Sequence, residues 1–355
     1  MDIKGEYMKM IKPRHLKRGD KVAIVSLSAG LLGESWAIHK LDIARERLES
    51  DFGLEVVVMP NAVKGVKYLD EHPEARASDL MDAFRDPSIK AIFNAIGGED
   101  AIRLLPYIDF DVIRNNPKIF TGYSDTTVNH MMMHKAGLIS YYGASVMNNF
   151  SEYVCINEYT KRSIVDILFE PKPRLNILPS EYESYAQDIV RWGEANKDTM
   201  RKYYARHIGY EILNGTGKVQ GELLGGCIYT FIYLMGTPLW PSLDDWRDKI
   251  LLIETSDDAV PLSIVEYILR NLEAQGIFKV IKGVIVGRHP IEAEIDEYKA
   301  CVKKVIVDEG KHYDLPIIYN VNVGHADPIG VFPLGESYEI DCDEKTLTLL
   351  EPATD

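Results

Sequence analysis

The most distinctive local pattern in the sequence places a serine between an expected strand and an expected helix. Residues 118–136 read KIFTGYSDTTVNHMMMHKA, so that a short apolar run passes through GYSD into a helical stretch. This is the layout of a nucleophile elbow, in which the turn exposes the Ser124 hydroxyl and the helix start offers unpaired backbone N–H groups to a developing oxyanion. Because the pattern is not GxSxG, an ordinary helix with Ser124 or Asp125 as its N-cap is an open alternative.

A serine nucleophile needs a general base, and His325 is the histidine best placed for that role. It lies in NVGHADP, residues 322–328, just after the run 316–320, which we expect to form a strand. Loops at the carboxyl ends of strands are where sites form in α/β proteins. The other histidines lie in charged segments, in a polar stretch, before a proline or on the helix after the serine: His15, His39, His72, His130, His134, His207, His289 and His312.

The base needs an orienting acid, and Glu254 closes the apolar run Lys249–Ile253. A carboxylate at the end of a buried strand is unfavourable unless it has a partner, so this position indicates a site. In the alternative, Glu254 is a solvated strand end that helps to cap the next helix. Asp257 or Asp258, which follow shortly after it, would then be the acid.

A pair of glycines, Gly97 and Gly98, follows the expected strand 91–96. The backbone N–H of Gly98 could provide one donor of an oxyanion hole, with that of Asp125 as the other. A plain strand-to-helix turn fits the pair equally well. Neither this pair nor GG at 225–226 matches GxGxxG or the P-loop pattern, so we expect no cradle for nucleotide phosphates.

Two histidines on the helix after the serine raise the alternative of a zinc hydrolase. His130 and His134 are four residues apart, which places them on one helix face. The run lacks the glutamate of HExxH, three methionines fill the gap, and no clean third ligand is near in the sequence. We therefore expect a helix face and no metal. An α/β protein that binds a ligand without turnover is a further alternative.

The elements that must position these residues alternate between strand and helix in the first half. Apolar runs expected to form strands are 21–27, 54–59, 91–96 and 118–121, and helices are expected at 36–52 and 75–85. This order is typical of parallel βαβ units with both sheet faces covered. We expect a flavodoxin-like or Rossmann-like parallel sheet in residues 1–150, with the serine at its carboxyl edge.

Residues 151–217 have a different character, with few β-branched runs and many charges and aromatic residues. We expect a linker and a partly helical polar insert there, such as a lid, a binding loop or a dimer contact. Trp192 lies in this insert and either stacks on an aromatic ligand group or packs the insert onto the body. In residues 218–355 we expect a second α/β domain with a mixed sheet. Its expected strands are 249–254, 280–287 and 316–320, its helices 263–275 and 295–309, and its antiparallel hairpin 337–350.

The composition is that of a soluble globular protein of about two domains. The 355 residues are 46% hydrophobic and 26% charged, and the formal net charge is −14. That charge disfavours nucleic acid and anionic lipid as partners. The chain has no apolar run of membrane-spanning length and no secretory signal pattern at its start, and its four cysteines form no CxxC pair. We therefore expect a cytoplasmic protein with reduced thiols.

Taken in order, these motifs resemble the LD-carboxypeptidase family of serine peptidases. The resemblance runs from LKRGDKVAIVS through AFRDPSIKAIFNAIGGED and KIFTGYSD to IET and GHADPIGVFPLG. It implies a triad of Ser124, Glu254 and His325, and an oxyanion hole from the backbone of Gly98 and Asp125. It also implies an N-terminal parallel α/β domain that carries the serine, a C-terminal domain that carries the other two residues, no cofactor, and a homodimer.

Two branches of that family differ in substrate. One releases the terminal D-alanine of murein tetrapeptides, and the other, the microcin C immunity branch, hydrolyses the amide of an aminoacyl-nucleotide. The long insert with Trp192 is more similar to the immunity branch, whose insert tryptophan stacks on the nucleobase. Many members have GGNL where this chain has Gly226-Cys227-Ile228. This departure weakens the direct transfer of the family's substrate contacts to this chain, in which the candidate contacts are Gly97, Trp192 and Cys227.

Overall fold

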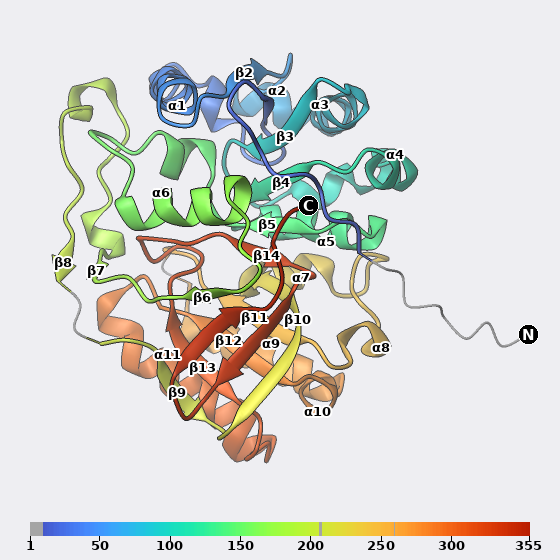
Figure 1. The fold of residues 1–355 in the computed structure, drawn as a ribbon, viewed down its shortest axis with the longest axis vertical. Helices are drawn as coiled ribbons and strands as arrows, with labels where there is room; N and C mark the ends of the chain where they lie inside the picture. Colours follow the sequence, from blue (N-terminus) through green and yellow to red (C-terminus); the bar gives the residue numbers. More distant parts are fainter. Residues whose placement is uncertain (1–9, 206–207, 259) are drawn as a thin grey trace, which may run out of the picture.

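Two sheets with helices packed around them form the two halves of the molecule (Figure 1). The computed structural model describes residues 10–205, 208–258 and 260–355. The six-stranded sheet lies in the upper half of Figure 1 and the eight-stranded sheet in the lower half. The predicted α/β class is confirmed, with a mostly parallel first sheet and a mixed second sheet.

The first sheet has the strand order β14-β5-β4-β3-β1-β2. Its strands are β1 Lys21–Val25, β2 Glu55–Val58, β3 Ile89–Asn94, β4 Ile119–Gly122, β5 Ser140–Tyr142 and β14 Phe332–Leu334. The first five are parallel in the order 2-1-3-4-5, which is the flavodoxin-like arrangement. Short β-branched runs such as KVAIV form these strands because helices cover both faces of a parallel sheet and both sets of side chains are buried.

The antiparallel edge strand β14 comes from the far end of the chain. It pairs with β5, with Phe332 opposite Tyr142. Because β14 follows the loop that carries His325 by only a few residues, this pairing draws that loop against the carboxyl edge of the first sheet, where Ser124 lies. The sequence analysis did not predict this strand, because three apolar residues form too short a run to be recognised.

Helices of the first half connect the parallel strands. They are α1 His39–Ser50, α2 Val66–Glu71, α3 Pro73–Arg85, α4 Phe110–Asn115 and α5 Thr126–Ala136, with single turns or short 3-10 segments at η1 Leu31–Gly33 and η2 Ala101–Tyr107. The π-helical turn η3 Val146–Phe150, the helix α6 Glu158–Ile164 and the π-helical turn η4 Val165–Phe169 follow β5. The helix α1 begins three residues after the expected start of the helix 36–52, because residues 35–38 form a turn.

The second sheet has the order β6-β16-β15-β10-β11-β12-β13-β9. Its strands are β6 Leu175–Ile177, β9 Glu211–Asn214, β10 Lys218–Cys227, β11 Ile250–Glu254, β12 Gly283–Gly287, β13 Ile317–Val321, β15 Ser337–Asp341 and β16 Thr346–Leu349. The central four, β10 to β13, are parallel, and the remaining pairings are antiparallel. The expected hairpin at 337–350 is present as β15 and β16.

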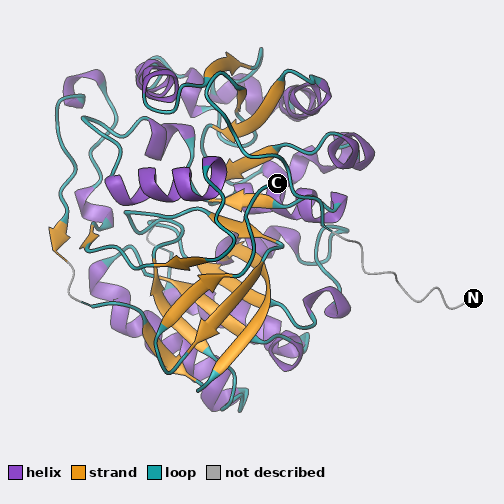
Figure 2. Ribbon diagram, in the orientation of Figure 1, coloured by secondary structure: helices purple, strands orange, loops and turns teal. Residues whose placement is uncertain are grey.

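Helices of the second half pack beside the parallel core of this sheet (Figure 2). They are α7 Phe231–Leu234, α8 Leu243–Trp246, α9 Leu262–Ala274, α10 Ile277–Val280 and α11 Ile295–Lys303, with 3-10 turns η7 Ile228–Thr230 and η8 Glu292–Glu294 and the π-helical turn η9 Lys304–Glu309. One hydrophobic cluster includes buried side chains of both halves, such as Val128 of α5 and Phe231 of α7. In the part of the chain that the structure describes, every helix is too short or too polar to cross a bilayer.

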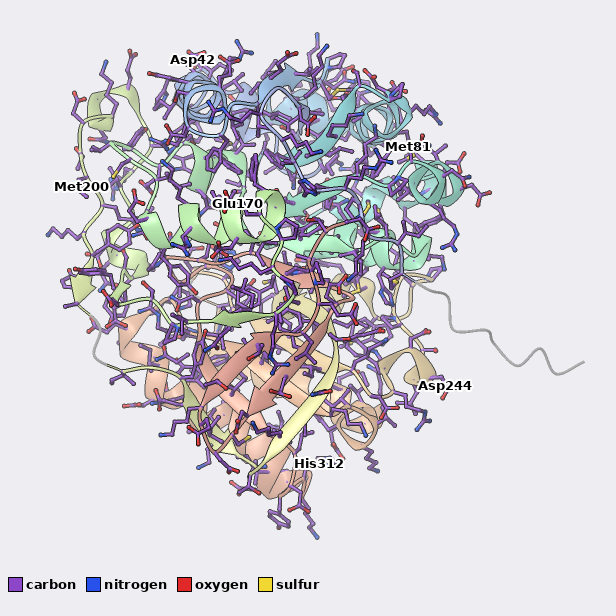
Figure 3. The ribbon with its side chains drawn as sticks, in the orientation of Figure 1. Asp42, Met81, Glu170, Met200, Asp244 and His312 are labelled. Carbon is purple, nitrogen blue, oxygen red and sulfur yellow. The ribbon has the colours of Figure 1, made fainter. Side chains whose placement is uncertain are left out.

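The polar insert runs along the left side of the molecule in Figure 3, where Met200 is labelled. It contains the two-stranded ribbon of β7 Tyr182–Glu183 and β8 Tyr204–Ala205 and the single 3-10 turns η5 Ala186–Asp188 and η6 Glu194–Asn196. Between β6 and β9 the helical content is limited to these turns, whereas α6 and η4 form the helical part of the range 151–217 that was expected to be partly helical. The strands β6 and β9, which flank the insert in the sequence, form the two edges of the second sheet and tie both ends of the insert to the body.

Candidate active site

A tight turn between β4 and α5 presents Ser124. The residue has φ 65°, in the left-handed region that a serine rarely adopts and that marks strained functional turns. The turn is held by Thr127, whose backbone N–H and side-chain hydroxyl both donate to the carbonyl oxygen of Ser124, at 2.9 and 2.7 Å. A Cβ added to Gly97 would lie 2.9 Å from the Ser124 Oγ, so only glycine allows this close approach of the two loops. The geometry is that of a nucleophile elbow.

Glu254 and His325 are hydrogen-bonded to each other. The Nδ1 of His325 lies 2.7 Å from the Oε2 of Glu254, which is fully buried at the end of β11. The other carboxylate oxygen accepts a hydrogen bond from the hydroxyl of Tyr142 at 2.5 Å. That same hydroxyl oxygen accepts a hydrogen bond from the backbone N–H of Ser124 at 3.1 Å. The acid is therefore linked to the histidine on one side and to the serine turn on the other.

The electrostatic environment favours the protonated form of His325. Burial by itself lowers the pKa of the imidazole, but the negative charge of Glu254 and its hydrogen bond outweigh this, and Asp257 and Asp258 add to the effect. Together they raise the pKa of His325 to about 9. With Nδ1 bound to Glu254, Nε2 is the nitrogen that remains for a proton exchange in the pocket.

A pocket of about 320 Å³ brings the candidate residues together. Its wall includes Ser124, His325, Gly97, Gly98 and Trp192. The two acids proposed as alternatives to Glu254 also lie on this wall, yet among the described residues neither forms a hydrogen bond with the imidazole. A larger cavity of about 850 Å³ lies beside the pocket, between α6 and the insert, and holds none of the three residues of the expected triad.

Two backbone N–H groups are candidates for an oxyanion hole. The carbonyl oxygen of Gly97 accepts a hydrogen bond from the backbone N–H of Ala29 at 3.2 Å. Since C=O and N–H point in opposite directions across a trans peptide, the N–H of Gly98 points away from Ala29. Within the described residues, neither this N–H nor that of Asp125, directly after the serine, forms a hydrogen bond, so both can receive a ligand oxygen.

Comparison with models of protein families tests the resemblance that the sequence motifs indicate. A family model of the LD-carboxypeptidase N-terminal domain matches residues 22–143, and one of the LD-carboxypeptidase C-terminal domain matches residues 220–340. The chain belongs to the LD-carboxypeptidase family. The resemblance inferred from the sequence motifs is confirmed, and a peptidase-type hydrolase is the activity that the family supports.

Several relatives of this LD-carboxypeptidase family member match it along most of their length. The chain is 29% identical to the putative carboxypeptidase VC_A0337 of Vibrio cholerae, over 96% of this chain and 98% of that one. It is 28% identical to the microcin C7 self-immunity protein MccF of Escherichia coli, over 78% of each chain. It is 27% identical to a probable murein peptide carboxypeptidase of Bacillus subtilis, over 98% of this chain and 97% of that one.

Solved structures of family members have the same fold. An MccF-like protein from Streptococcus pneumoniae in complex with AMP is 33% identical and superimposes with a TM-score of 0.85, over 93% of this chain and 98% of that one. The microcin C7 self-immunity protein MccF in complex with aspartyl sulfamoyl adenosine is 25% identical, with a TM-score of 0.83, over 97% of this chain and all of that one.

Trp192 of this family member lines the pocket and also packs the insert onto the body, so both roles considered for it stay open. Its ring stacks on that of Trp36, with centroids 6.1 Å apart and planes inclined by 22°, and the ammonium of Lys40 lies 5.6 Å from its centroid. The next residue, Gly193, donates its backbone N–H to the hydroxyl of Tyr153 at 2.9 Å. These contacts fix the tip of the insert against the first half of the molecule, with the indole on the pocket wall.

Cys227 lies beneath the candidate triad rather than on the pocket wall. It is buried at the end of β10, opposite Glu254 of β11. Its sulfur, a carboxylate oxygen of Glu254 and a ring nitrogen of His325 lie within 4.8 Å of one another, the single group of three possible metal ligands among the described residues. Burial raises the pKa of the Cys227 thiol well above its usual range, and a protonated thiol is a poor ligand.

The zinc alternative has little support from the two helix histidines. Both ring nitrogens of His130 are within hydrogen-bond distance of protein oxygens, Ser140 Oγ at 2.8 Å and the Gly122 carbonyl at 2.9 Å. Burial lowers the pKa of both His130 and His134 to about 4, which keeps them neutral. His130 therefore braces the strand before the serine turn, as a buried structural histidine does.

Sequence reasoning missed two residues that the structure places at the site. Tyr142 reads as a core tyrosine at the end of a short strand, and nothing in the sequence links it to Glu254. Arg201, almost fully buried in the insert, forms an ion pair with Asp327, two residues after His325, and donates to Ser184 Oγ at 2.9 Å. The sequence signal that could have indicated a residue such as Arg201 is Asp327, because a carboxylate within the GHADP motif needs a partner.

Replacing Tyr142 by phenylalanine tests its link to the acid. A hydrogen bond to a charged group is worth about 1.5–3 kcal/mol, so we expect kcat to fall about 10- to 100-fold. Tyr141→Phe is the matched control, because its hydroxyl is also buried but donates to the carbonyl of Ala353 at 2.8 Å. Thermal unfolding should show a loss of stability in both variants, larger in Tyr142→Phe, and steady-state kinetics should show a loss of kcat in Tyr142→Phe alone. An equal loss of kcat in both would contradict the role of Tyr142.

Proposed function

We propose that this chain is a serine hydrolase that cleaves an amide bond with Ser124, His325 and Glu254. The observation that carries the proposal is the hydrogen bond from the fully buried Glu254 to His325, whose ring lies on the wall of the same pocket as the strained Ser124 turn. A buried carboxylate bound to an imidazole beside a serine at an elbow is the arrangement that nucleophilic acyl transfer requires. Membership of the LD-carboxypeptidase family supports the same reaction class.

The reaction proceeds through an acyl-enzyme. His325 takes the hydroxyl proton as Ser124 Oγ attacks the carbonyl carbon, and the negative charge moves to the carbonyl oxygen. The backbone N–H groups of Gly98 and Asp125 stabilise this oxyanion. Collapse of the tetrahedral intermediate breaks the C–N bond, and the imidazolium gives its proton to the leaving nitrogen. Water then attacks the ester with His325 again as base and releases the carboxylic acid and the free serine.

Glu254 acts through the histidine. It fixes the tautomer of the imidazole and stabilises the imidazolium that forms in each step. The chemistry needs no cofactor, and these residues supply every proton transfer. The homodimer and the cytoplasmic location expected from the sequence stay predictions.

For the substrate we propose an aminoacyl-nucleotide amide, as in the microcin C immunity branch. Two relatives support this choice, since one structure of an MccF-like protein is in complex with AMP and one of MccF is in complex with aspartyl sulfamoyl adenosine. In this chain Trp192 and Ser124 line the same pocket. Aromatic side chains bind nucleobases by stacking, which suits such a ligand. The function would be detoxification of an aminoacyl-nucleotide.

The second candidate is a murein LD-carboxypeptidase that releases the terminal D-alanine of tetrapeptides. The relative from Bacillus subtilis named as a probable murein peptide carboxypeptidase favours it. A mass-spectrometric assay with both substrates side by side separates the two functions. Cleavage of an aminoacyl-sulfamoyl adenosine alone is the expected result. Cleavage of the tetrapeptide alone would assign the chain to murein recycling and contradict the proposed substrate.

Trp192→Ala tests whether the indole binds the nucleobase. Stacking of a base on an aromatic side chain is worth about 1–3 kcal/mol, so we expect KM for the nucleotide substrate to rise roughly 5- to 150-fold while kcat changes less. The matched variant Trp192→Phe keeps an aromatic face and should retain most of the affinity. Isothermal titration with AMP measures the same contact without turnover. If Trp192→Ala binds AMP as the wild type does, the indole is a packing residue.

A further inference from the structure

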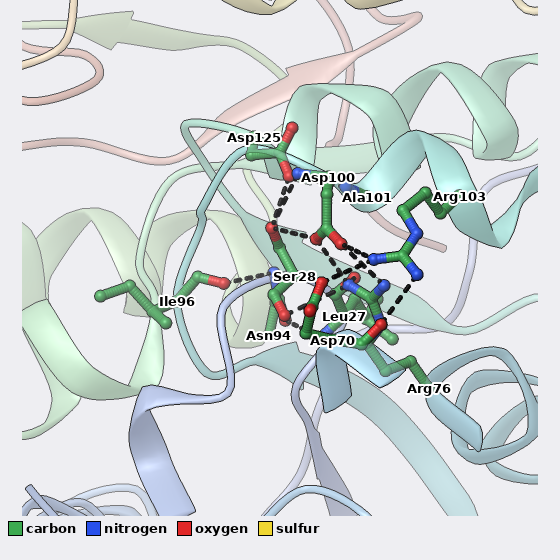
Figure 4. Close-up of polar contacts among 10 residues, drawn as sticks. All are labelled: Leu27, Ser28, Asp70, Arg76, Asn94, Ile96, Asp100, Ala101, Arg103 and Asp125. Carbon is green, nitrogen blue, oxygen red and sulfur yellow. Dashed lines mark hydrogen bonds and ion pairs between the residues drawn. The ribbon is translucent and has the colours of Figure 1, made fainter. Parts of the chain in front are cut away.

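A network of polar side chains links Asp125, the residue directly after Ser124, to the loops that follow β1 and β3 (Figure 4). Its centre is the carboxylate of Asp125, which is fully buried and does not cap its own helix. One oxygen of this carboxylate accepts two hydrogen bonds, from the hydroxyl of Ser28 at 2.6 Å and from the backbone N–H of Ala101 at 2.9 Å. Both donors belong to the first half of the chain, on loops that follow β1 and β3.

These two loops are the ones that shape the glycine turn. Ala101 is three residues after Gly98, and Ser28 directly precedes Ala29, whose N–H binds the Gly97 carbonyl. A Cβ added to Gly98 would lie 2.3 Å from the Ser28 hydroxyl, so this hydroxyl and the glycine turn are in direct contact. Asp125 directly follows the candidate nucleophile Ser124. Its side chain therefore joins the serine turn to the glycine turn that carries the other candidate oxyanion donor, the N–H of Gly98.

An ion pair holds the loop of Ser28 in place. Arg76 of α3 is almost fully buried and binds Asp100 through both terminal nitrogens, at 2.7 and 3.0 Å. The same guanidinium donates to the carbonyl oxygens of Leu27 and Ser28, each at 3.3 Å. A planar, always charged guanidinium with several fixed donors is well suited to hold two loops in one geometry. Asp100 also binds Arg103, which extends the network towards the surface.

We propose that Ser28 and the carboxylate of Asp125 are positioning residues for the oxyanion hole. They hold its two donors, the N–H groups of Gly98 and Asp125, at a fixed separation. The Arg76–Asp100 ion pair in turn holds the loop of Ser28. The physical reason is preorganisation, because donors that are already in place need no reorganisation when the oxyanion forms. The strained φ of Ser124 requires such a brace, since the turn would otherwise relax. The inference rests on the proposed serine hydrolase function and names what positions its oxyanion hole.

Ser28→Ala is the direct test, because it removes the hydroxyl and leaves the backbone of both donors intact. Loss of one oxyanion donor lowers kcat about 100- to 1000-fold, so a displaced donor should lower it about 10- to 100-fold with KM unchanged. The same loss is expected in the rate at which a fluorophosphonate modifies Ser124, followed by mass spectrometry of the intact chain. This reagent also forms a charged oxygen in its transition state, and it needs no knowledge of the natural substrate.

Ser26→Ala is the matched control on the same loop. The Ser26 hydroxyl is equally buried and donates to the carbonyl of Ala62 at 2.7 Å, away from the glycine turn. Both variants should lose a similar amount of thermal stability, whereas only Ser28→Ala should react slowly. Modification of Ser28→Ala at the wild-type rate, or an equal loss in Ser26→Ala, would overturn the proposal.

The same activity and labelling measurements on Ser124→Ala distinguish failure of the proposed function from failure of the positioning role of Ser28. If Ser124→Ala keeps hydrolytic activity, the proposed function itself fails. If Ser124→Ala is inactive and unmodified while Ser28→Ala equals the wild type, the serine hydrolase stands and only the positioning role of Ser28 is wrong.

Discussion

Ser124→Ala is expected to lose at least about a thousandfold in turnover while the chain folds normally. The loss follows from the removal of the nucleophile, since no acyl-enzyme can form and only binding and the oxyanion donors remain. Stability should be preserved, because within the described residues the Ser124 hydroxyl forms no hydrogen bond and alanine is no more strained than serine at this φ. Initial rates on the two candidate substrates, with thermal unfolding of the same preparations, measure both effects.

Ser145→Ala is a suitable control for this experiment. Its hydroxyl is buried and has no hydrogen-bond partner among the described residues, so the substitution removes the same atom at a position outside the pocket wall. We expect wild-type turnover in this variant. If Ser124→Ala keeps measurable turnover close to that of Ser145→Ala, the nucleophile is another group and the proposed mechanism is wrong.

The three residues of the candidate triad could be found from the sequence because each follows an apolar run that forms a parallel strand. Ser124 follows β4, Glu254 ends β11 and His325 follows β13, and the carboxyl ends of such strands meet at one edge of their sheet. What the sequence could not provide was the contact between the two sheets. That contact depends on β14, three residues long, which joins the first sheet from the far end of the chain.

The contacts of Tyr142 and Arg201 were harder to predict from the sequence, for a physical reason. Tyr142 is separated from Glu254 by 112 positions, and a buried tyrosine at the end of a short strand has the same local pattern whether or not its hydroxyl has a role. The range 151–217 was expected to be partly helical, and α6 with η4 is its helical part. Between β6 and β9 the chain forms a ribbon and single turns, held by long-range contacts such as Arg201 with Asp327. The contact of Tyr142 has no local signature, and for the contact of Arg201 the local signal is confined to Asp327 in the GHADP motif.

Asp257 and Asp258 illustrate how structure separates alternatives that sequence leaves equal. All three acids follow β11 or end it, and any of them could orient a base. Only Glu254 is fully buried and bonded to the imidazole, whereas the other two line the pocket. Their charges still act on His325 through space and raise the pKa of its imidazole, so they influence the site without direct contact.

Glu254→Gln is expected to combine a large loss of rate with a shifted pH profile. In a chymotrypsin-type triad, replacing the acid by an amide of the same shape lowers kcat about 10⁴-fold, because the imidazole takes the wrong tautomer. We expect kcat of Glu254→Gln to fall about 10³- to 10⁴-fold for the same reason. Glu336→Gln is the matched control, as Glu336 is another buried glutamate, paired with Lys12 at 2.9 Å and not on the pocket wall. It should leave kcat unchanged.

The sign of the pH effect follows from the raised pKa of His325. The base must be neutral to accept the serine proton, so in the wild type kcat/KM should rise with pH through about 9. In Glu254→Gln the charge that raises this pKa is gone while burial, which lowers it, remains. The rising limb should therefore move to lower pH, although the maximal rate falls. A limb that stays in place would mean that Glu254 does not control the ionisation of His325.

Stability should report the same coupling in a measurement that needs no substrate. Because the folded-state pKa of His325, about 9, lies above the ordinary value of 6.5, the Glu254–His325 pair stabilises the fold fully below 6.5 and loses this contribution as the pH rises through about 9. Chemical unfolding of the wild type and Glu254→Gln at a series of pH values should thus show the largest difference at the acidic end of that window and a smaller one above it. A difference that does not depend on pH would show that the glutamine acts through packing alone, and that the histidine is not charged by its partner.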